Sequence, residues 1–353
     1  GITASFAPLL MSASLLVPTM MLGSGGAAAQ VVLDECDVTA GTASDIGNSV
    51  DNVPTAVTCK DGGSTATGFN ATAGGTGNTA TGNNSTALGA NNTTVGANST
   101  AVGDGNTADA DRASAIGSGN LANGINSTAH GYRNTADALN STAVGRENKA
   151  MAEGSSAFGN TSTATGVRSS AMGNDNTSNG DNSSAVGFSN TSNGDNSSAV
   201  GEGNTADGDT SSAMGSGNTA LGIASSALGF GNEADGENSS ALGDGNTANG
   251  DRSSAVGSGN AAEGTNSTAL GYLNTADALN STAVGRANTA MAEGSSAFGN
   301  ISTATGVRSS AMGNDNNANG NNSSAVGFTN TSNGDTGRCE PSTMPIISSF
   351  SDA

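Results

Sequence analysis

One tripeptide, consisting of Ala, a variable side chain and Gly, recurs eighteen times at a spacing of fourteen residues, from 87–89 to 325–327. A short fixed period without insertions predicts a solenoid, in which each repeat forms one coil and packs on its neighbours. The 353-residue length then measures extension rather than domain number. A disordered low-complexity chain would also fit 54 glycines and no tryptophan, but it has no physical reason to keep this register.

Each fourteen-residue coil contains two similar halves, as in 84–89 followed by 92–96. This length predicts two short strands joined by tight turns, with glycine supplying turn conformations that a side chain would hinder. The glycine of the second half is replaced by alanine five times, and we expect a different or strained turn at each of these positions: Ala110, Ala138, Ala152, Ala278 and Ala292.

Side chains alternate between the two faces of a strand, so the repeated Ala and the larger residue after it must point in opposite directions. Alanine suits the narrow space between the two strands of a coil, and the larger residue is therefore predicted to point outward. An exposed apolar stripe of this size favours burial against other copies of the chain. We call these residues the apolar row and predict that they form an oligomer interface: Leu88, Val102, Ile116, His130, Val144, Phe158, Met172, Val186, Val200, Met214, Leu228, Leu242, Val256, Leu270, Val284, Phe298, Met312 and Val326.

The outward residue of the second half-coil is mostly polar, which predicts one hydrated face. Its residues include Asp109, Asn123, Asp137, Asn179, Asn193, Asp207, Asp235 and Asn249. The formal net charge of −20 argues against nucleic acid or an anionic membrane surface as a partner, because both need clustered Lys and Arg.

Residues 1–29 contain no charged residue, are apolar from Leu9 to Leu22 and end in three alanines. This pattern predicts a secretory signal that is N-terminally incomplete, since the initiating Met and basic leader are missing; a transmembrane segment is the alternative. Export to an oxidising compartment predicts a disulfide between Cys36 and Cys59. Cys339 follows the last coil, too far away to join them, and is either free or intermolecular.

Two of the repeats, Asn-Ser-Thr-Ala-Val-Gly at 98–103 and Ser-Ser-Ala-Val-Gly at 183–187, resemble those of the YadA-like head of trimeric autotransporter adhesins. The resemblance extends over about residues 63–335. It implies an all-β, left-handed parallel β-roll, with three chains packed around an axis through the apolar row. It also implies a virulence-associated adhesin on the outer membrane of a Gram-negative-type bacterium, binding matrix proteins, cells, abiotic surfaces or other bacteria.

The sequence thus divides into a signal peptide (1–29), an N-terminal cap segment (30–62), the head repeats (63–335) and a C-terminal tail (336–353). The family's neck, heptad stalk and membrane β-barrel do not follow Asp335 in this sequence. We therefore expect any membrane attachment to use an anchor outside this chain.

A longer duplication is superimposed on the coils, because residues 98–195 recur at 238–335. Where the two copies differ, the chain supplies its own substitution experiment. Four exchanges involve ionisable side chains that cannot be essential to the coil: His130 corresponds to Leu270, Arg133 to Leu273, Glu147 to Ala287 and Lys149 to Thr289.

His130 is the only histidine, and a trimer would bring three imidazoles together near its axis, where they could hold an ion. The alternative, which Leu270 in the second copy favours, is a tolerated replacement of an apolar residue. No nucleophile, base and orienting group can be assembled from the sequence, so we expect no enzyme activity, cofactor or metal site. The nine-residue repeat of calcium-binding rolls also differs from this period.

Two other functions compete with adhesion. One is a structural subunit of a surface fibre. The other is ice binding by stacked outward threonines, although the neighbouring Asp and Asn row favours ordinary hydration instead. The threonine row includes Thr79, Thr93, Thr107, Thr135, Thr163, Thr177, Thr191 and Thr205.

Overall fold

A computed structural model describes the backbone of residues 36–40 and 55–59 and the whole of residues 63–336. The predicted signal segment, Cys339 and the tail after residue 336 lie outside these residues. The chain divides into two compact units, residues 1–175 and 176–353, and each is described by itself. The described part of the chain contains no helix long and apolar enough to cross a membrane.

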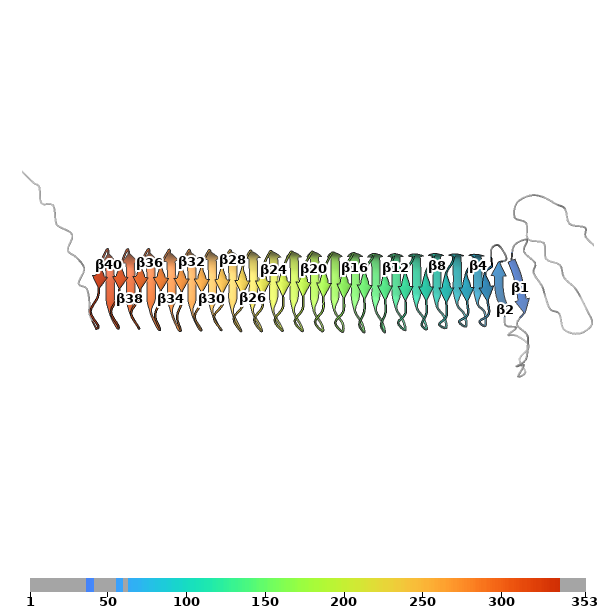
Figure 1. The fold of residues 1–353 in the computed structure, drawn as a ribbon, viewed down its shortest axis with the longest axis horizontal. Helices are drawn as coiled ribbons and strands as arrows, with labels where there is room; N and C mark the ends of the chain where they lie inside the picture. Colours follow the sequence, from blue (N-terminus) through green and yellow to red (C-terminus); the bar gives the residue numbers. More distant parts are fainter. Residues whose placement is uncertain (1–35, 41–54, 60–62, 337–353) are drawn as a thin grey trace, which may run out of the picture. The chain divides into compact units, whose positions relative to one another are not determined.

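In the first unit, each coil consists of a five-residue strand and a two-residue strand (Figure 1). The long strands are β4 (Thr72–Thr76), β6 (Thr86–Ala90), β8 (Thr100–Asp104), β10 (Ser114–Ser118), β12 (Thr128–Tyr132), β14 (Thr142–Arg146), β16 (Ser156–Asn160) and β18 (Ser170–Asn174). The short strands are β3 (Thr65–Ala66), β5 (Thr79–Ala80), β7 (Thr93–Thr94), β9 (Thr107–Ala108), β11 (Leu121–Ala122), β13 (Thr135–Ala136), β15 (Lys149–Ala150) and β17 (Thr163–Ala164).

The second unit repeats the same coil. Its long strands are β20 (Ser184–Phe188), β22 (Ser198–Glu202), β24 (Ser212–Ser216), β26 (Ser226–Phe230), β28 (Ser240–Asp244), β30 (Ser254–Ser258), β32 (Thr268–Tyr272), β34 (Thr282–Arg286), β36 (Ser296–Asn300), β38 (Ser310–Asn314) and β40 (Ser324–Phe328). Its short strands are β19 (Thr177–Ser178), β21 (Thr191–Ser192), β23 (Thr205–Ala206), β25 (Thr219–Ala220), β27 (Glu233–Ala234), β29 (Thr247–Ala248), β31 (Ala261–Ala262), β33 (Thr275–Ala276), β35 (Thr289–Ala290), β37 (Thr303–Ala304), β39 (Asn317–Ala318) and β41 (Thr331–Ser332).

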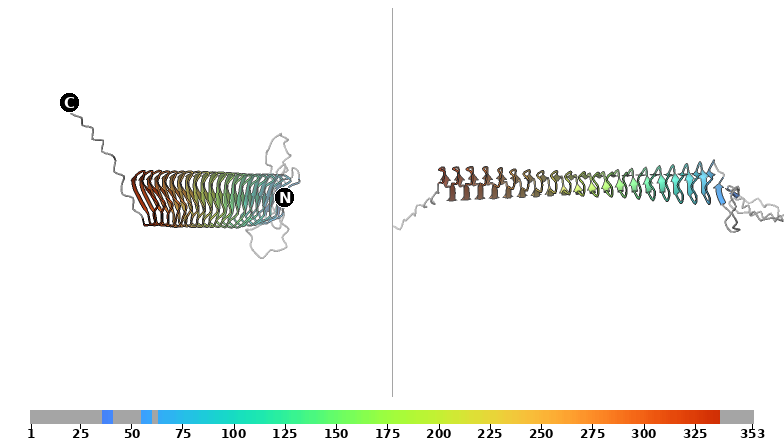
Figure 2. Two further views of the ribbon diagram at one scale, coloured as in Figure 1. Left: turned by 60° about the vertical axis from the view of Figure 1, so that its left-hand side comes forward. Right: turned by 90° about the horizontal axis from the view of Figure 1, so that it is seen from below.

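Equivalent strands of successive coils pair in parallel within each unit, side by side in both views of Figure 2. The register places every residue beside its counterpart fourteen positions along, as when Ala115 pairs with Ala129 and Gly117 with Gly131. The predicted all-β solenoid of fourteen-residue coils is confirmed. We number coil positions from 1, the first residue of the long strand, to 14, so that the coil 212–225 begins at Ser212.

Small side chains fill the interior of every coil. The alanines of positions 2 and 9, such as Ala213 and Ala220, are fully buried, and so is the serine of position 14, such as Ser225. Among residues 63–336, alanine is the only apolar residue type that is buried. The inward orientation of the repeated alanine is therefore confirmed.

A buried asparagine at position 7 links each coil to the next. The Asn218 Nδ2 group donates to the carbonyl oxygens of Met214, at 2.9 Å, and Gly229, at 2.8 Å, and lies 3.0 Å from Asn204 Oδ1. Asn218 Oδ1 in turn accepts from both the backbone N–H and Nδ2 of Asn232, at 3.1 and 2.9 Å. We call this row of amides the asparagine ladder.

The ladder is interrupted at the same place in both sequence copies, where position 7 is Ser162 or Ser302. The Ser302 Oγ atom is too short to reproduce the amide contacts, and its bonds to the Gly313 carbonyl and the Asn316 N–H are both 3.4 Å long. Bonds at this distance are weak. The coil of Ser302 therefore lacks the short amide bonds that its neighbours have.

The repeated glycine of position 4 is required by both conformation and space. Gly215 has φ = 119°, and a Cβ there would lie 2.0 Å from the carbonyl oxygen of Gly229 in the next coil. No other residue type fits such an approach, which explains the strict Ala-x-Gly pattern.

Of the five turns with alanine in place of glycine at position 11, four differ from a glycine turn as predicted, and the fifth, at Ala110, has Ala113 in place of the turn serine. The Gly264 N–H donates to the Ala276 carbonyl of the next coil over 3.3 Å. The Ala278 N–H instead donates to Ser281 Oγ, at 3.1 Å, within its own turn. Ala138, Ala152 and Ala292 make the same local bond.

The two strands before the coils form an antiparallel pair. In β1 (Cys36–Ala40) and β2 (Thr55–Cys59) the backbone places Cys36 opposite Cys59, and β2 pairs in parallel with β4. The side chains of β1 and β2 lie outside the described part of the chain, so the disulfide stays a prediction.

Replacing Asn218 with alanine should destabilise the second unit by roughly 2–4 kcal/mol, because the buried Asn232 N–H and several buried acceptors lose their partner. Thermal unfolding and hydrogen exchange of the neighbouring strands measure the loss. The matched control is Asn249→Ala, an exposed asparagine, for which a change within about 0.5 kcal/mol is expected. Equal effects of the two variants would contradict a special role for the ladder.

The interruption gives the converse prediction. Ser302→Asn should restore the amide contacts and slow hydrogen exchange in β36 and β38, because the added Nδ2 group would reach the carbonyls that other ladder residues contact. Faster exchange in this variant would show that the coil has adapted to serine.

Candidate interaction surface

The apolar row points outward from the long strands in both units. Its exposed members range from 36% exposure for Val200 to 43% for Leu270 and Val326, and its remaining members, such as Val186 and Val256, are half-buried. The apolar row recurs at every coil from Leu88 to Val326, and exposed apolar surface of this extent is typical of an interaction site. The outward orientation follows the sequence prediction, and its role as an interface stays a prediction.

Aromatic residues widen this surface, and sequence analysis missed them. Position 5 lies on the same strand face two residues after the apolar row, and in five coils it carries a large exposed ring. The five are Tyr132 (40% exposed), Phe188 (50%), Phe230 (64%), Tyr272 (47%) and Phe328 (62%). Because side chains alternate along a strand, the residue two positions after the apolar row lies on the same face, and this rule could have identified the aromatic residues from the sequence.

Strand hydroxyls border the apolar row on its other side. Position 1 of every long strand is Ser or Thr, half-buried in most coils. The long-strand face thus consists of a hydroxyl row, an apolar row and a mixed row with aromatic residues. Such a face offers extensive apolar contact with some polar pairing.

The opposite face, over the short strands, is mainly polar. The predicted threonine row is half-buried at Thr191 and Thr205, and the Asn193 Nδ2 group beside it donates to Asp207 Oδ1 at 2.7 Å. Apolar residues interrupt this polar face at Val95 (48% exposed), Met151 (42%), Leu221 (42%) and Met291 (52%). The face is hydrated but not uniform.

Many turn carboxylates make structural hydrogen bonds. At position 12 the backbone N–H of Asp181 donates to Asp195 Oδ1, at 2.8 Å, and that of Asp195 donates to Asp209 Oδ1, at 3.0 Å. On the short-strand face, burial raises the pKa of Glu233, and a hydrogen bond to Asp235 and the charges of Asp235 and Glu263 add to the rise. No group of three potential metal-ligating side chains occurs among the described residues.

His130 lies in the apolar row beside a strand hydroxyl. Its Nε2 atom is 2.9 Å from Ser114 Oγ in the preceding coil, and partial burial lowers its pKa below the ordinary value. Burial therefore favours the neutral imidazole over the charged imidazolium in the folded chain. Leu270 occupies the equivalent place in the second copy, with an identical backbone register.

A scan of protein families matches the repeats of this chain to the YadA head domain repeat, in two-copy segments. The matched residues are 66–92, 95–120, 122–148, 152–176, 178–204, 206–232, 234–260, 262–288, 290–316 and 304–330. A comparison with curated protein sequences found no match.

The lowered pKa of His130 predicts the direction of a pH effect. The unfolded chain binds a proton more tightly than the folded chain, so this group's contribution is complete above the ordinary His pKa of about 6.5 and is lost as the pH falls below it. The melting temperature should therefore fall modestly between pH 8 and pH 5. This pH dependence of the melting temperature should be absent in His130→Leu, a variant that we expect to be neutral or mildly stabilising. Leu270→His should add a second pH-dependent contribution of the same sign. A loss of adhesion in His130→Leu would instead support an ion site or switch.

Proposed function

Because the chain belongs to the YadA head repeat family, we propose that it is the head of a trimeric cell-surface adhesin. Three chains pack through the apolar row, and the opposite faces remain in solvent. The observation that carries this proposal is the outward apolar residue at position 3 of every coil from Leu88 to Val326, exposed or half-buried, with the single polar exception of His130.

Burial of this row supplies a driving force that the single chain lacks. The coil interior holds only small side chains, so most of the large apolar side chains remain in contact with water. Removing them from water on assembly contributes about 25 cal/mol for each Å² of apolar surface. Summed over many coils, this favours an obligate oligomer.

The solvent-facing surface then presents similar, mainly polar patches at many coils of each chain. Weak binding at one patch becomes strong attachment when many patches bind together, because each further contact is made at high effective concentration. Matrix proteins, cells and abiotic surfaces are the ligand classes that this chemistry suits. The proposed location is the bacterial cell surface, reached by export, and the function needs no catalytic step or cofactor.

The assembly is tested by adding charge to the apolar row. Val186→Asp with Val200→Asp should dissociate or precipitate the trimer, because each unpaired buried carboxylate costs several kcal/mol. The matched control is Thr191→Asp with Thr205→Asp, which adds the same charge to the opposite face of the same coils and should leave the trimer intact. Analytical ultracentrifugation measures both. A native chain that sediments as a monomer would contradict the proposed assembly.

Adhesion is tested on surfaces against the ice-binding alternative. The native chain should be retained on matrix-protein-coated and bare polystyrene surfaces, and the Val186→Asp, Val200→Asp variant should lose most of that retention because multivalency is lost. Thermal hysteresis that disappears when Thr191 and Thr205 are replaced by bulky residues would favour ice binding instead. Retention that does not depend on assembly would contradict the avidity argument.

A further inference from the structure

The turn after each long strand has one residue, at position 6, that projects from the edge of the long-strand face. We call it the corner residue. It adopts the left-handed conformation, and in five consecutive coils of the second unit it is glycine, from Gly203 to Gly259. The next three coils carry Leu273, Ala287 and Ile301 instead, with φ between 53° and 56°.

These three side chains are unfavourable at such a position within the single chain. Left-handed backbone is disfavoured for residues with a Cβ, and a β-branched residue such as Ile301 is an outlier there. Leu273 and Ile301 are also each 50% exposed. Neither local backbone preference nor burial within the chain accounts for aliphatic residues at these corners.

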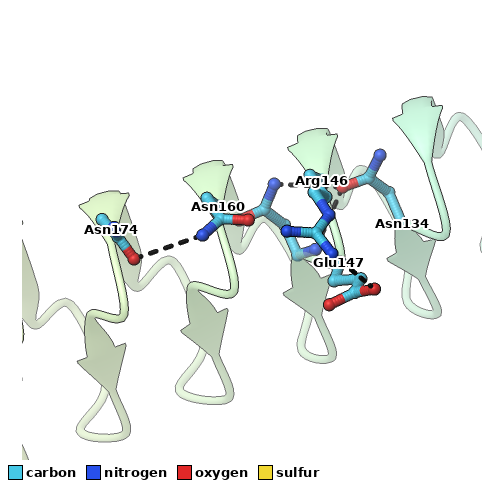
Figure 3. A network of polar contacts seen from close by, with 6 residues as sticks. Asn134, Arg146, Glu147, Asn160 and Asn174 are labelled. Atoms are coloured by element: carbon cyan, nitrogen blue, oxygen red, sulfur yellow. Dashed lines mark hydrogen bonds and ion pairs between the residues drawn. The ribbon is translucent and has the colours of Figure 1, made fainter.

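The equivalent corners of the first copy are polar, and two of the three have side-chain partners within the chain. Arg133 lies with its guanidinium carbon 5.0 Å from the centre of the Tyr132 ring. Glu147 forms an ion pair of 3.6 Å with Arg146, which Figure 3 shows on the outside of the coils. The third corner is Thr161.

The differences between the copies are confined to one edge of these coils. Over residues 126–176 and their counterparts 266–316 the sequences differ at only five positions. All five are at position 3, 6 or 8, and the turns at positions 10–13 are identical. The exchanges are His130 to Leu270, Arg133 to Leu273, Glu147 to Ala287, Lys149 to Thr289 and Thr161 to Ile301.

Each exchange removes an ionisable group or adds an aliphatic one, so the second copy carries apolar side chains at three successive corners. Leu273 follows Tyr272, which is 47% exposed, and lies on the same coil as Leu270 of the apolar row, at 43%. A Cβ on Gly259 would lie 2.7 Å from Leu273 Cδ2, so the leucine leans across the turn of the preceding coil. At Leu273 the corner therefore extends the apolar row sideways, whereas Arg286 and Asn300 occupy position 5 of the next two coils.

We infer that the corner of Leu273, Ala287 and Ile301 packs against a neighbouring copy of this chain and strengthens the trimer there, whereas the corner of Arg133, Glu147 and Thr161 stays in solvent. This inference rests on the proposed trimer. The occupant is a second copy because Leu273 extends the apolar row on its own coil, and a copy that covers this row also reaches its edge.

The two copies supply matched variants for the test. Leu273→Arg, Ala287→Glu and Ile301→Thr together give the second corner the residues of the first, and Arg133→Leu, Glu147→Ala and Thr161→Ile make the reverse exchange. All six residues already occupy these turns in the native chain, so the coil accepts them. The full chain and both triple variants are compared by sedimentation equilibrium and by the dependence of the melting temperature on protein concentration.

The first variant should dissociate at protein concentrations about tenfold or more above those that dissociate the native trimer, because apolar contact is lost. The reverse variant should not be weakened. If the native chain is a trimer and the first variant is equally stable, the corner does not contact a neighbour and the inference is wrong, while the proposed function stands. If the native chain is a monomer, the proposed assembly is overturned, and this inference with it.

Discussion

The asparagine ladder is the interaction on which the rest of each coil depends. A fourteen-residue coil with two strands leaves room only for small side chains and one amide between its walls, mostly alanine and serine with Thr94 in one coil. Dispersion and the hydrophobic effect scale with buried apolar surface, and alanine methyl groups supply little of either. The amide instead joins three successive coils through short bonds to carbonyls and to its own neighbours, in an interior where hydrogen bonds are strong.

The same lack of interior space determines the outer surface. A Phe or Met cannot enter the coil, so every large apolar residue of the repeat points outward, as Phe298 and Met312 do. In the proposed trimer these residues are buried by assembly rather than by folding. Stability and oligomerisation are then expected to be coupled, as in obligate oligomers generally.

Periodicity and alternation were enough to predict the coil, the buried alanines and the outward apolar row. They did not identify the ladder, because asparagine occurs twice in many coils with opposite roles. Asn126 is exposed in a left-handed turn, where short polar side chains are favoured, whereas Asn120 is buried at position 7. Residue type alone does not separate them. The distinguishing signal is a constant distance of four residues from the apolar row, which corresponds to the bond from Asn120 Nδ2 to the Ile116 carbonyl.

Two departures from the repeat occur in the same turn, so the coils are not expected to be uniform in local stability. Ser302, which interrupts the ladder, directly follows Ile301, whose backbone is strained, and Thr161 and Ser162 repeat this arrangement in the first unit. Because each coil of a solenoid contacts only its neighbours, such losses stay local. A turn with weak interior hydrogen bonds and a strained corner is expected to open more readily than turns with a ladder asparagine and a corner glycine, such as that of Gly217 and Asn218. At Ile301, apolar contact with a neighbouring chain would offset the cost of the strained, weakly bonded turn. The more polar Thr161 has less to gain from such a contact. Two coils with nearly the same sequence are therefore expected to differ in local stability once the chain assembles.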